Sequence, residues 1–243
     1  MIFPNLPEVV PARTRTCRVF RTGPQQQRVL ATPGAMHYQK QGAWETIDLT
    51  PQVVGGRFQP TATPYAAVFD PSTRTLSYMN AEGGTVELVL ETVNGAVPPF
   101  TPITPNSRMV FSLQLAPGLL LEARFYPEGM ELFRRVLSPL GIVPLRWRIT
   151  ETLANTPQHN LLAMTGRDNQ GGRPRRLVEV QIVKSEEVLS ATHRTYLVTE
   201  QLTGRVRDVD YATGVRTWNT NILYPVLVDV SIQETIATGV DDG

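Results

Sequence analysis

Residues 65–91, YAAVFDPSTRTLSYMNAEGGTVELVLE, contain the clearest β-sheet pattern in the chain. Three short runs rich in β-branched, aromatic and aliphatic residues are separated by Asp70-Pro71-Ser72-Thr73 and Asn80-Ala81-Glu82-Gly83-Gly84. Both separators are typical of turns, because proline presets the φ of a second turn position and glycine accepts positive φ. In the third run, Thr85–Glu91, apolar residues alternate with polar or exposed positions, as in a half-buried strand. The stretch therefore predicts a three-strand meander.

The same alternation extends in both directions from this meander. The segments that show it are Cys17–Arg21 with Arg28–Ala31, Met36–Gln39 with Trp44–Leu49, 109–126 as a hairpin, 145–150, Leu177–Val183, Arg194–Thr199, Arg205–Tyr211 with Val215–Asn219, and 226–232. Residues 128–137 fit either a helix or a strand, and we favour a strand because the neighbouring segments are β. The pattern predicts an all-β protein, a β-sandwich or jelly-roll-like body.

Proline placement suggests how the chain is divided. Residues 1–16 contain Pro4, Pro7 and Pro11 and are expected to form an extended arm, since proline blocks helix and biases its predecessor toward extended geometry. Residues 97–107 are rich in proline and threonine and are expected to form a long connection. This gives a first β half at 17–96 and a second at 108–243, either within one body or as two β subdomains.

Charge and cysteine content exclude several classes of protein. The 243 residues carry 23 basic and 22 acidic side chains, so we expect neither nucleic acid nor a charged membrane surface as a partner. The single cysteine, Cys17, cannot form an internal disulfide. We see no signal peptide and no apolar run near the length of a membrane span. We expect synthesis in the cytoplasm.

The sequence contains few residues that could bind a metal ion or act in catalysis. The histidines, His37, His159 and His193, are isolated in sequence, whereas a metal site needs clustered ligands. The acidic pairs Asp208/Asp210 and Asp241/Asp242 lack the spacing of a calcium loop. We expect no metal and no cofactor.

A hydrolase is the least favoured functional class. Glu87 and Glu91 belong to the solvent-facing side of the Thr85–Glu91 strand, whereas glycoside hydrolysis needs two carboxyl groups across a cleft. No Gly-x-Ser-x-Gly sequence is present, and Cys17 has no neighbouring histidine. We expect no catalytic residue and a non-enzymatic protein.

Two basic groups are candidate partner contacts. Arg173, Arg175 and Arg176 lie in 166–176, which we expect to be an exposed loop, and Arg13 and Arg15 lie in the arm. These arginines, with Pro4, Pro7 and Pro11, could dock on another subunit. The alternative is a solvated loop balanced by nearby acids. Because the overall charge is balanced, we favour subunit contact over nucleic acid.

Two of the three tryptophans are candidates for stacking on a ligand. Trp44 flanks a predicted hairpin tip, and Trp218 belongs to a predicted hairpin strand. Exposed aromatic rings at such positions are compatible with glycan binding. Trp147 alternates with Leu145 and Ile149 and is expected in the core.

Two stretches resemble a known module. Met36–Asp48 is similar to the hairpin hY-x-x-x-G-x-W-x-x-I-D of a β-rich module found ahead of DNRLRE-type domains in bacterial surface proteins and in phage structural proteins. Tyr224-Pro225-Val226-Leu227-Val228-Asp229 resembles its later Tyr-Pro-Val-x-(Ile/Val)-Asp-Pro segment, with Val230 in place of the last proline. Thr63–Phe69 resembles an intervening strand, so the likeness spans roughly 36–232. These motifs are structural and contain no catalytic residue.

The resemblance implies a structural protein of a bacteriophage particle, on capsid or tail, with other virion proteins as partners and a homo-oligomeric state. Virion localisation follows from this expectation. Deleting residues 1–16 should then weaken assembly while the monomer stays folded. The alternative is a glycan- or receptor-binding β-sandwich module, which predicts an exposed Trp44 or Trp218.

Overall fold

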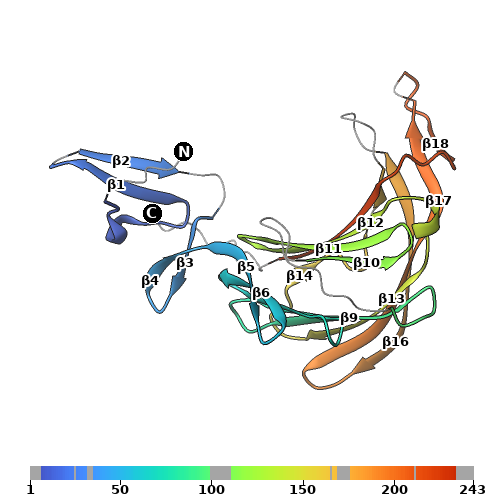
Figure 1. Ribbon diagram of the computed structural model, residues 1–243, viewed down its shortest axis with the longest axis horizontal. Coiled ribbons are helices and arrows are strands. Elements are labelled where there is room, and N and C mark those ends of the chain that lie inside the picture. The colour runs from blue at the N-terminus through green and yellow to red at the C-terminus, as the bar shows by residue number, and fades with distance from the viewer. Residues whose placement is uncertain are drawn as a thin grey trace.

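The computed structural model describes residues 7–24, 26–31, 35–98, 111–164, 166–168, 176–210 and 212–233, which fold as an all-β, sandwich-like protein (Figure 1). The strands are β1 (Cys17–Gly23), β2 (Gln26–Ala31), β3 (His37–Lys40), β4 (Ala43–Thr46), β5 (Asp48–Val54), β6 (Arg57–Ala62), β7 (Ala66–Asp70), β8 (Thr75–Met79), β9 (Thr85–Val93), β10 (Phe111–Ala116), β11 (Leu119–Tyr126), β12 (Gly129–Val136), β13 (Leu145–Thr152), β14 (Gln158–His159), β15 (Gly166–Arg167), β16 (Leu177–Leu189), β17 (His193–Val209), β18 (Arg216–Asn219) and β19 (Val226–Gln233). Two single-turn 3₁₀ helices, η1 (Val10–Ala12) and η2 (Pro139–Gly141), complete the described elements.

Two hairpins near the N-terminus form small sheets of their own. β1 pairs with β2, and β3 pairs with β4. The β3–β4 turn is Gln41-Gly42, with φ of 52° and 82°, as expected for a tight hairpin whose two central residues have positive φ. Figure 1 shows the blue β1 and β2 set apart from the larger body.

The remaining strands follow one another through a single large sheet. Its order is β10-β11-β12-β19-β15-β16-β17-β13-β9-β8-β7-β6-β5, with β14 added on β19 and β18 on β17. The predicted meander is present as β7, β8 and β9. β13 pairs with β9 on one side and β17 on the other, so the two predicted halves of the chain share one sheet.

β15, the shortest strand on this path, joins β19 to β16. Gly166 pairs with Val228 of β19 on one side and Val178 of β16 on the other. A Cβ at position 166 would lie 3.0 Å from the carbonyl oxygen of Val178 and 3.3 Å from Leu202. Glycine at position 166 therefore lets β15 lie close to Val178 of β16 and Leu202 of β17.

The core lies between the layer that contains β11, β12 and β19 and the layer that contains β9, β13 and β17, as Figure 1 shows for β11, β12, β9 and β13. Buried and partly exposed residues alternate along β13, where Leu145, Trp147 and Ile149 face inward as predicted. The same alternation in β19 buries Val226, Val228, Val230 and Ile232. Burial of these apolar faces, at about 25 cal/mol per Å², holds the layers together.

Several expectations can be compared with these elements. Residues 128–137 form a strand, β12, as we favoured. The prediction that 166–176 is an exposed loop is wrong for Gly166 and Asp168, which are buried, and for Arg176, whose side chain is 10% exposed; Arg167 is exposed but belongs to strand β15. The rest of that stretch and most of 97–107 lie outside the described residues. In the part of the chain that the structure describes, no helix is long and apolar enough to span a membrane.

Candidate functional site

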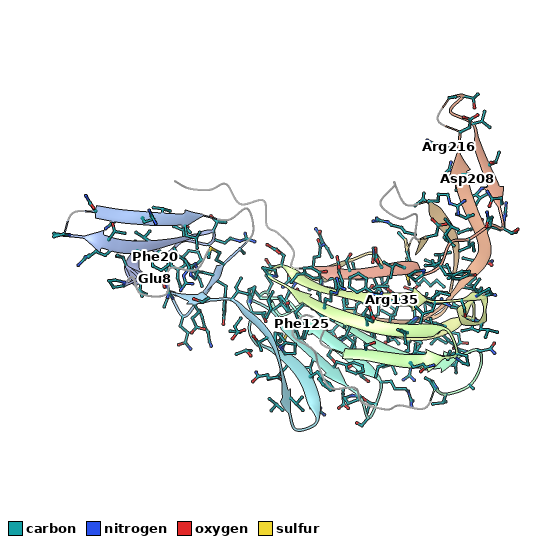
Figure 2. The ribbon with its side chains drawn as sticks, turned by 45° about the horizontal axis from the view of Figure 1, so that its top comes forward. Glu8, Phe20, Phe125, Arg135, Asp208 and Arg216 are labelled. Atoms are coloured by element: carbon teal, nitrogen blue, oxygen red, sulfur yellow. The ribbon has the colours of Figure 1, made fainter. Side chains whose placement is uncertain are left out.

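The described part of the N-terminal arm contacts its own hairpins. The carbonyl oxygen of Pro7 accepts a hydrogen bond from Arg21 N at 2.9 Å, and Glu8 forms a bridge with Phe20 (Figure 2). The Glu8 carboxylate binds both Arg13 and Arg18, and these two guanidinium groups lower its pKa to about 2. These contacts occupy residues that we predicted to reach another subunit.

The other predicted arm residues differ in position. Arg13 also donates to the carbonyl oxygen of Trp44, and the backbone of Arg15, whose side chain is exposed, accepts from Met36 N at 2.7 Å. Pro11 belongs to η1, and Pro4 lies outside the described residues. The described arm thus joins the β1–β2 and β3–β4 hairpins.

Arg176 is an internal ion-pair partner, contrary to the prediction of an exposed basic loop. Its side chain is 10% exposed and binds Asp168 at 2.6 Å and Asp208 at 3.2 Å. It also donates to the carbonyl oxygen of Asn221. Burial alone would lower the pKa of the Arg176 guanidinium, but its hydrogen bonds and ion pairs with Asp168 and Asp208 raise it above its usual range. Arg173 and Arg175 lie outside the described residues.

The two candidate stacking tryptophans have different surroundings. Trp44 is half-buried in β4. Trp218 is 41% exposed in β18, and the guanidinium groups of Arg205 and Arg207 lie 5.3 and 5.9 Å from the centre of its ring. Of the two, Trp218 therefore offers the larger exposed aromatic surface. Two guanidinium groups already contact this ring through cation–π interactions.

β16 presents a long free edge. It pairs with β17 along its length, whereas β15 covers its other side only at Leu177 and Val178. Among the described residues, nothing pairs with this outer edge beyond Val178. Val183, Val188 and Leu189 on this strand are 50%, 66% and 67% exposed. An exposed edge of this kind offers unpaired backbone groups to another strand.

The two ends of the large sheet are less open to pairing. β5 contains Pro51, which lacks an N–H donor, and its register shifts between Asp48 and Pro51. β10 has only six residues and an irregular register near Gln114. By contrast, the pairing of β16 with β17 is regular from Val180 to Ser185. β16 is therefore the edge best suited to add a strand.

A polar cavity of about 370 Å³ lies on the face of β11, β12 and β19 opposite the core. Strand register places its lining side by side: Arg124 opposite Glu131, Phe133 opposite Asp229, and Leu227 between Arg135 and Arg167. Tyr126, Asp168 and Pro225 complete the lining. Three guanidinium groups and three carboxylates thus share one cavity.

Four lining atoms have no hydrogen-bond partner although they are buried. They are Nε of Arg124, Nε of Arg135, Oδ1 of Asp168 and Oδ1 of Asp229. The other oxygen of Asp168, a side chain with 0% exposure, is held by Arg176 and by Leu223 N. Because these atoms are closed to solvent, a group that enters the cavity contacts the exposed parts of the lining side chains rather than these atoms.

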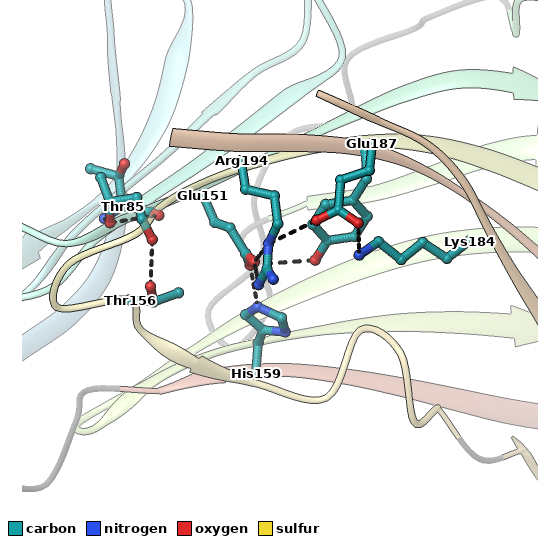
Figure 3. A network of polar contacts seen from close by, with 9 residues as sticks. Thr85, Glu151, Thr156, His159, Lys184, Glu187 and Arg194 are labelled. Atoms are coloured by element: carbon teal, nitrogen blue, oxygen red, sulfur yellow. Dashed lines mark hydrogen bonds and ion pairs between the residues drawn. The ribbon is translucent and has the colours of Figure 1, made fainter. Parts of the chain in front are cut away.

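A second charged cluster joins the layers (Figure 3). The Glu151 carboxylate, fully buried in β13, accepts from His159 Nε2 at 2.7 Å, from Arg194 and from the Tyr196 hydroxyl at 3.3 Å. Burial alone would raise the pKa of Glu151, but the hydrogen bonds from His159 and Arg194 hold it below its usual range. Both oxygens are already bound, so we interpret this cluster as a structural tie between β13, β14 and β17.

Within the described ranges, no three His, Cys, Asp or Glu side chains lie close enough together to hold a metal ion. The histidines remain separate. His37 is buried and contacts the carbonyl oxygen of Thr14 through Nδ1, His159 binds Glu151, and His193 contacts Thr192 on the surface.

Sequence reasoning missed the polar cavity. Its residues come from the β11–β12 hairpin and from segments at β15 and β19 that lie far from it in the chain, and each strand alone reads as an ordinary alternation of core and solvent positions. One signal was present: in 124–135 the outward positions carry Arg124, Glu131 and Arg135 together with the aromatic Phe133. A face that mixes cations, an anion and an aromatic ring is a reason to look for a ligand.

Comparison with known proteins found no matching family model, no matching curated protein and no matching solved structure.

Proposed function

We propose that this protein is a non-enzymatic structural subunit of a bacteriophage particle, on capsid or tail, that acts through contacts between subunits. The mechanism is strand addition: the free edge of β16 pairs with a strand of a second copy. Main-chain hydrogen bonds supply the affinity, and alternate side chains such as Val183 supply specificity.

The exposed edge of β16 is the observation that carries this proposal. Its regular run from Val180 to Ser185 is long enough for a strand of ordinary length. Most proteins protect such an edge with charges, proline or a bulge. Here a bulge at Glu186, with φ of 53°, and the charges of Lys184 and Glu187 limit pairing to the first part of the strand.

The resemblance to phage structural proteins is the reason for proposing a bacteriophage particle as the assembly. The hairpin of the resemblance forms β3 and β4, and the Tyr224-Pro225-Val226 segment leads into β19. Both segments build the scaffold. The proposal therefore assigns no catalytic step and no cofactor to the chain.

Light scattering on the purified protein tests the assembly role. We expect a defined oligomer for the natural chain and a shift to monomer for Val183→Lys, because a second charge beside Lys184 opposes close strand pairing. Val53→Lys is the matched control, since Val53 is a similarly exposed valine (55%) on the protected edge strand β5. A monomer for the natural chain at all concentrations, or equal behaviour of both variants, contradicts the β16 proposal.

Particle membership needs a separate test. Antibodies against the purified chain should label particles isolated from the phage whose genome encodes it, and labelling should persist through a density gradient. Absence of the chain from washed particles contradicts a virion role, whatever the oligomeric state.

A glycan- or receptor-binding module is the second candidate function. The exposed ring of Trp218 favours it, although a sugar that stacks there must displace Arg205 or Arg207. Trp218→Ala should abolish binding to host cells if this ring carries recognition.

A further inference from the structure

The polar cavity on β11, β12, β19 and β15 has the character of a ligand site. Its volume of about 370 Å³ falls within the range of about 300–1,000 Å³ that is usual for small-molecule pockets. Its polar groups come from four different strands, whose register fixes their relative positions. Asp168 is buried beneath the cavity and is held by Arg176, so this side of the lining is also fixed.

The lining side chains define what the ligand must offer. The guanidinium groups of Arg124, Arg135 and Arg167 are donors, and the carboxylates of Glu131 and Asp229 are acceptors. A carboxylate or phosphate would satisfy the donors alone, and an ammonium group would satisfy the acceptors alone. A hydroxyl group both donates and accepts, so several neighbouring hydroxyls satisfy both kinds.

The charge of the cavity favours a neutral ligand. Arg124, Arg135 and Arg167 are balanced by Glu131, Asp168 and Asp229. Arg135 is further paired with Glu122 at 2.9 Å, and Arg124 lies over the Phe133 ring at 4.8 Å. An ion would enter next to a charge of its own sign, whereas an uncharged polar molecule would not.

The lining also has an apolar part. Phe133, Leu227 and Pro225 line the cavity beside the charged groups. A sugar ring is complementary to such a lining, because it has polar hydroxyls around its edge and apolar C–H groups on its faces. Such a ring can pack on Leu227 and Pro225, since the Arg124 guanidinium already lies over the Phe133 ring, while its hydroxyls reach the carboxylates and guanidinium groups.

We propose that this cavity binds one uncharged sugar unit, either free or at the end of a glycan. The proposal does not depend on strand addition at β16, because no residue of β16 lines the cavity. The cavity would give an assembled particle a site for a carbohydrate without any contribution from Trp44 or Trp218.

Titration of the full chain with neutral methyl glycosides, followed by saturation-transfer NMR and calorimetry, tests the ligand class. The probes are the methyl glycosides of glucose, galactose, mannose and N-acetylglucosamine, which present the sugar as it occurs at a glycan end. We expect saturable binding of at least one. Free monosaccharides distinguish the sources: preference for the glycoside assigns a glycan end, and preference for the free sugar assigns a metabolite.

Glucuronate and glucosamine serve as charged counterparts. Binding of either one in place of every neutral probe overturns the proposal of an uncharged ligand. No saturable binding of any neutral probe also overturns it.

Matched variants test the location. Arg167→Ala and Asp229→Asn should weaken binding about tenfold, the effect of losing one hydrogen bond to a charged group. Arg216→Ala is the control, because Arg216 is an exposed arginine on β18 outside the cavity. Val183→Lys should bind the sugar unchanged, which separates this proposal from the assembly role. Equal affinity for Arg167→Ala, Asp229→Asn and the natural chain overturns the location.

Discussion

Arg134 and Glu200 form an ion pair inside the core, with 2.8 Å between Nη1 and Oε1 and side chains only 3% and 2% exposed. Arg134 belongs to β12 in one layer and Glu200 to β17 in the other, so the pair links the layers directly. Arg134 also donates to the carbonyl oxygen of Val143. Burial raises the pKa of Glu200, while Arg134 acts in the opposite direction.

Removal of one member of this pair should be strongly destabilising. Glu200→Gln leaves the Arg134 charge buried without its counter-ion, and we expect a loss of about 3–5 kcal/mol in the free energy of unfolding, measured in urea. The double variant Arg134→Met/Glu200→Leu should recover most of that loss because no charge remains buried. A Glu200→Gln protein as stable as the natural one contradicts this account.

The Glu151 cluster should contribute a pH dependence. The pKa of Glu151 is lower in the folded protein than its ordinary value of 4.5, so its stabilisation is fully present above that value and is lost as the pH falls through the folded pKa. Glu151→Gln should therefore flatten the acid side of a plot of unfolding free energy against pH. An unchanged slope between the two proteins contradicts a lowered pKa.

The Tyr65 hydroxyl links the start of β7 to the β11–β12 turn, and we expect this contact to stabilise the fold. Its hydroxyl lies 2.7 Å from the carbonyl oxygen of Tyr126 and 2.6 Å from that of Gly129. Tyr65→Phe keeps the stacking on Tyr78 but removes the donor, at an expected cost of about 1 kcal/mol in thermal or urea unfolding. A variant with unchanged stability indicates that water replaces the hydroxyl.

Gly84 should be intolerant of any side chain. A Cβ at this position would lie 1.7 Å from the carbonyl oxygen of Asn155, which Asn80 Nδ2 also contacts at 2.8 Å. Gly84→Ala must displace backbone, and we expect a loss of about 2 kcal/mol or more.

Gly83→Ala is the matched control for this substitution. Gly83 has φ of +80° and open space around its Cβ position, so only conformational strain of about 1 kcal/mol applies. A larger loss for Gly83→Ala than for Gly84→Ala is the result that contradicts the steric argument.

Strands with strict alternation could be predicted from the sequence. β13 is an example: Leu145, Trp147 and Ile149 face the core as expected, because side-chain direction in a strand depends only on position. β16 and β17 are longer than predicted. The predicted strand ends at Val183, whereas β16 continues to Leu189 beside β17, with a bulge between Ser185 and Val188.

The buried polar groups could not be predicted in the same way. Alternation places Glu151 on the core face of β13, but its partners His159 and Arg194 come from β14 and β17. Arg176 in turn depends on Asp168 and Asp208, which lie near it because β15 and β17 both pair with β16. Such contacts are set by strand order, and a single sequence does not specify which distant strands become neighbours.

Strand order also has a consequence for biosynthesis. β19 lies between β12 and β15, so the middle of the sheet is filled by residues 226–233. Until that segment leaves the ribosome, the nascent chain carries β12 with an unsatisfied inner edge. This layer therefore completes its strand pairing only after residues 226–233 have been synthesised, and incomplete chains with an unpaired β12 edge are the species on which we expect chaperones to act.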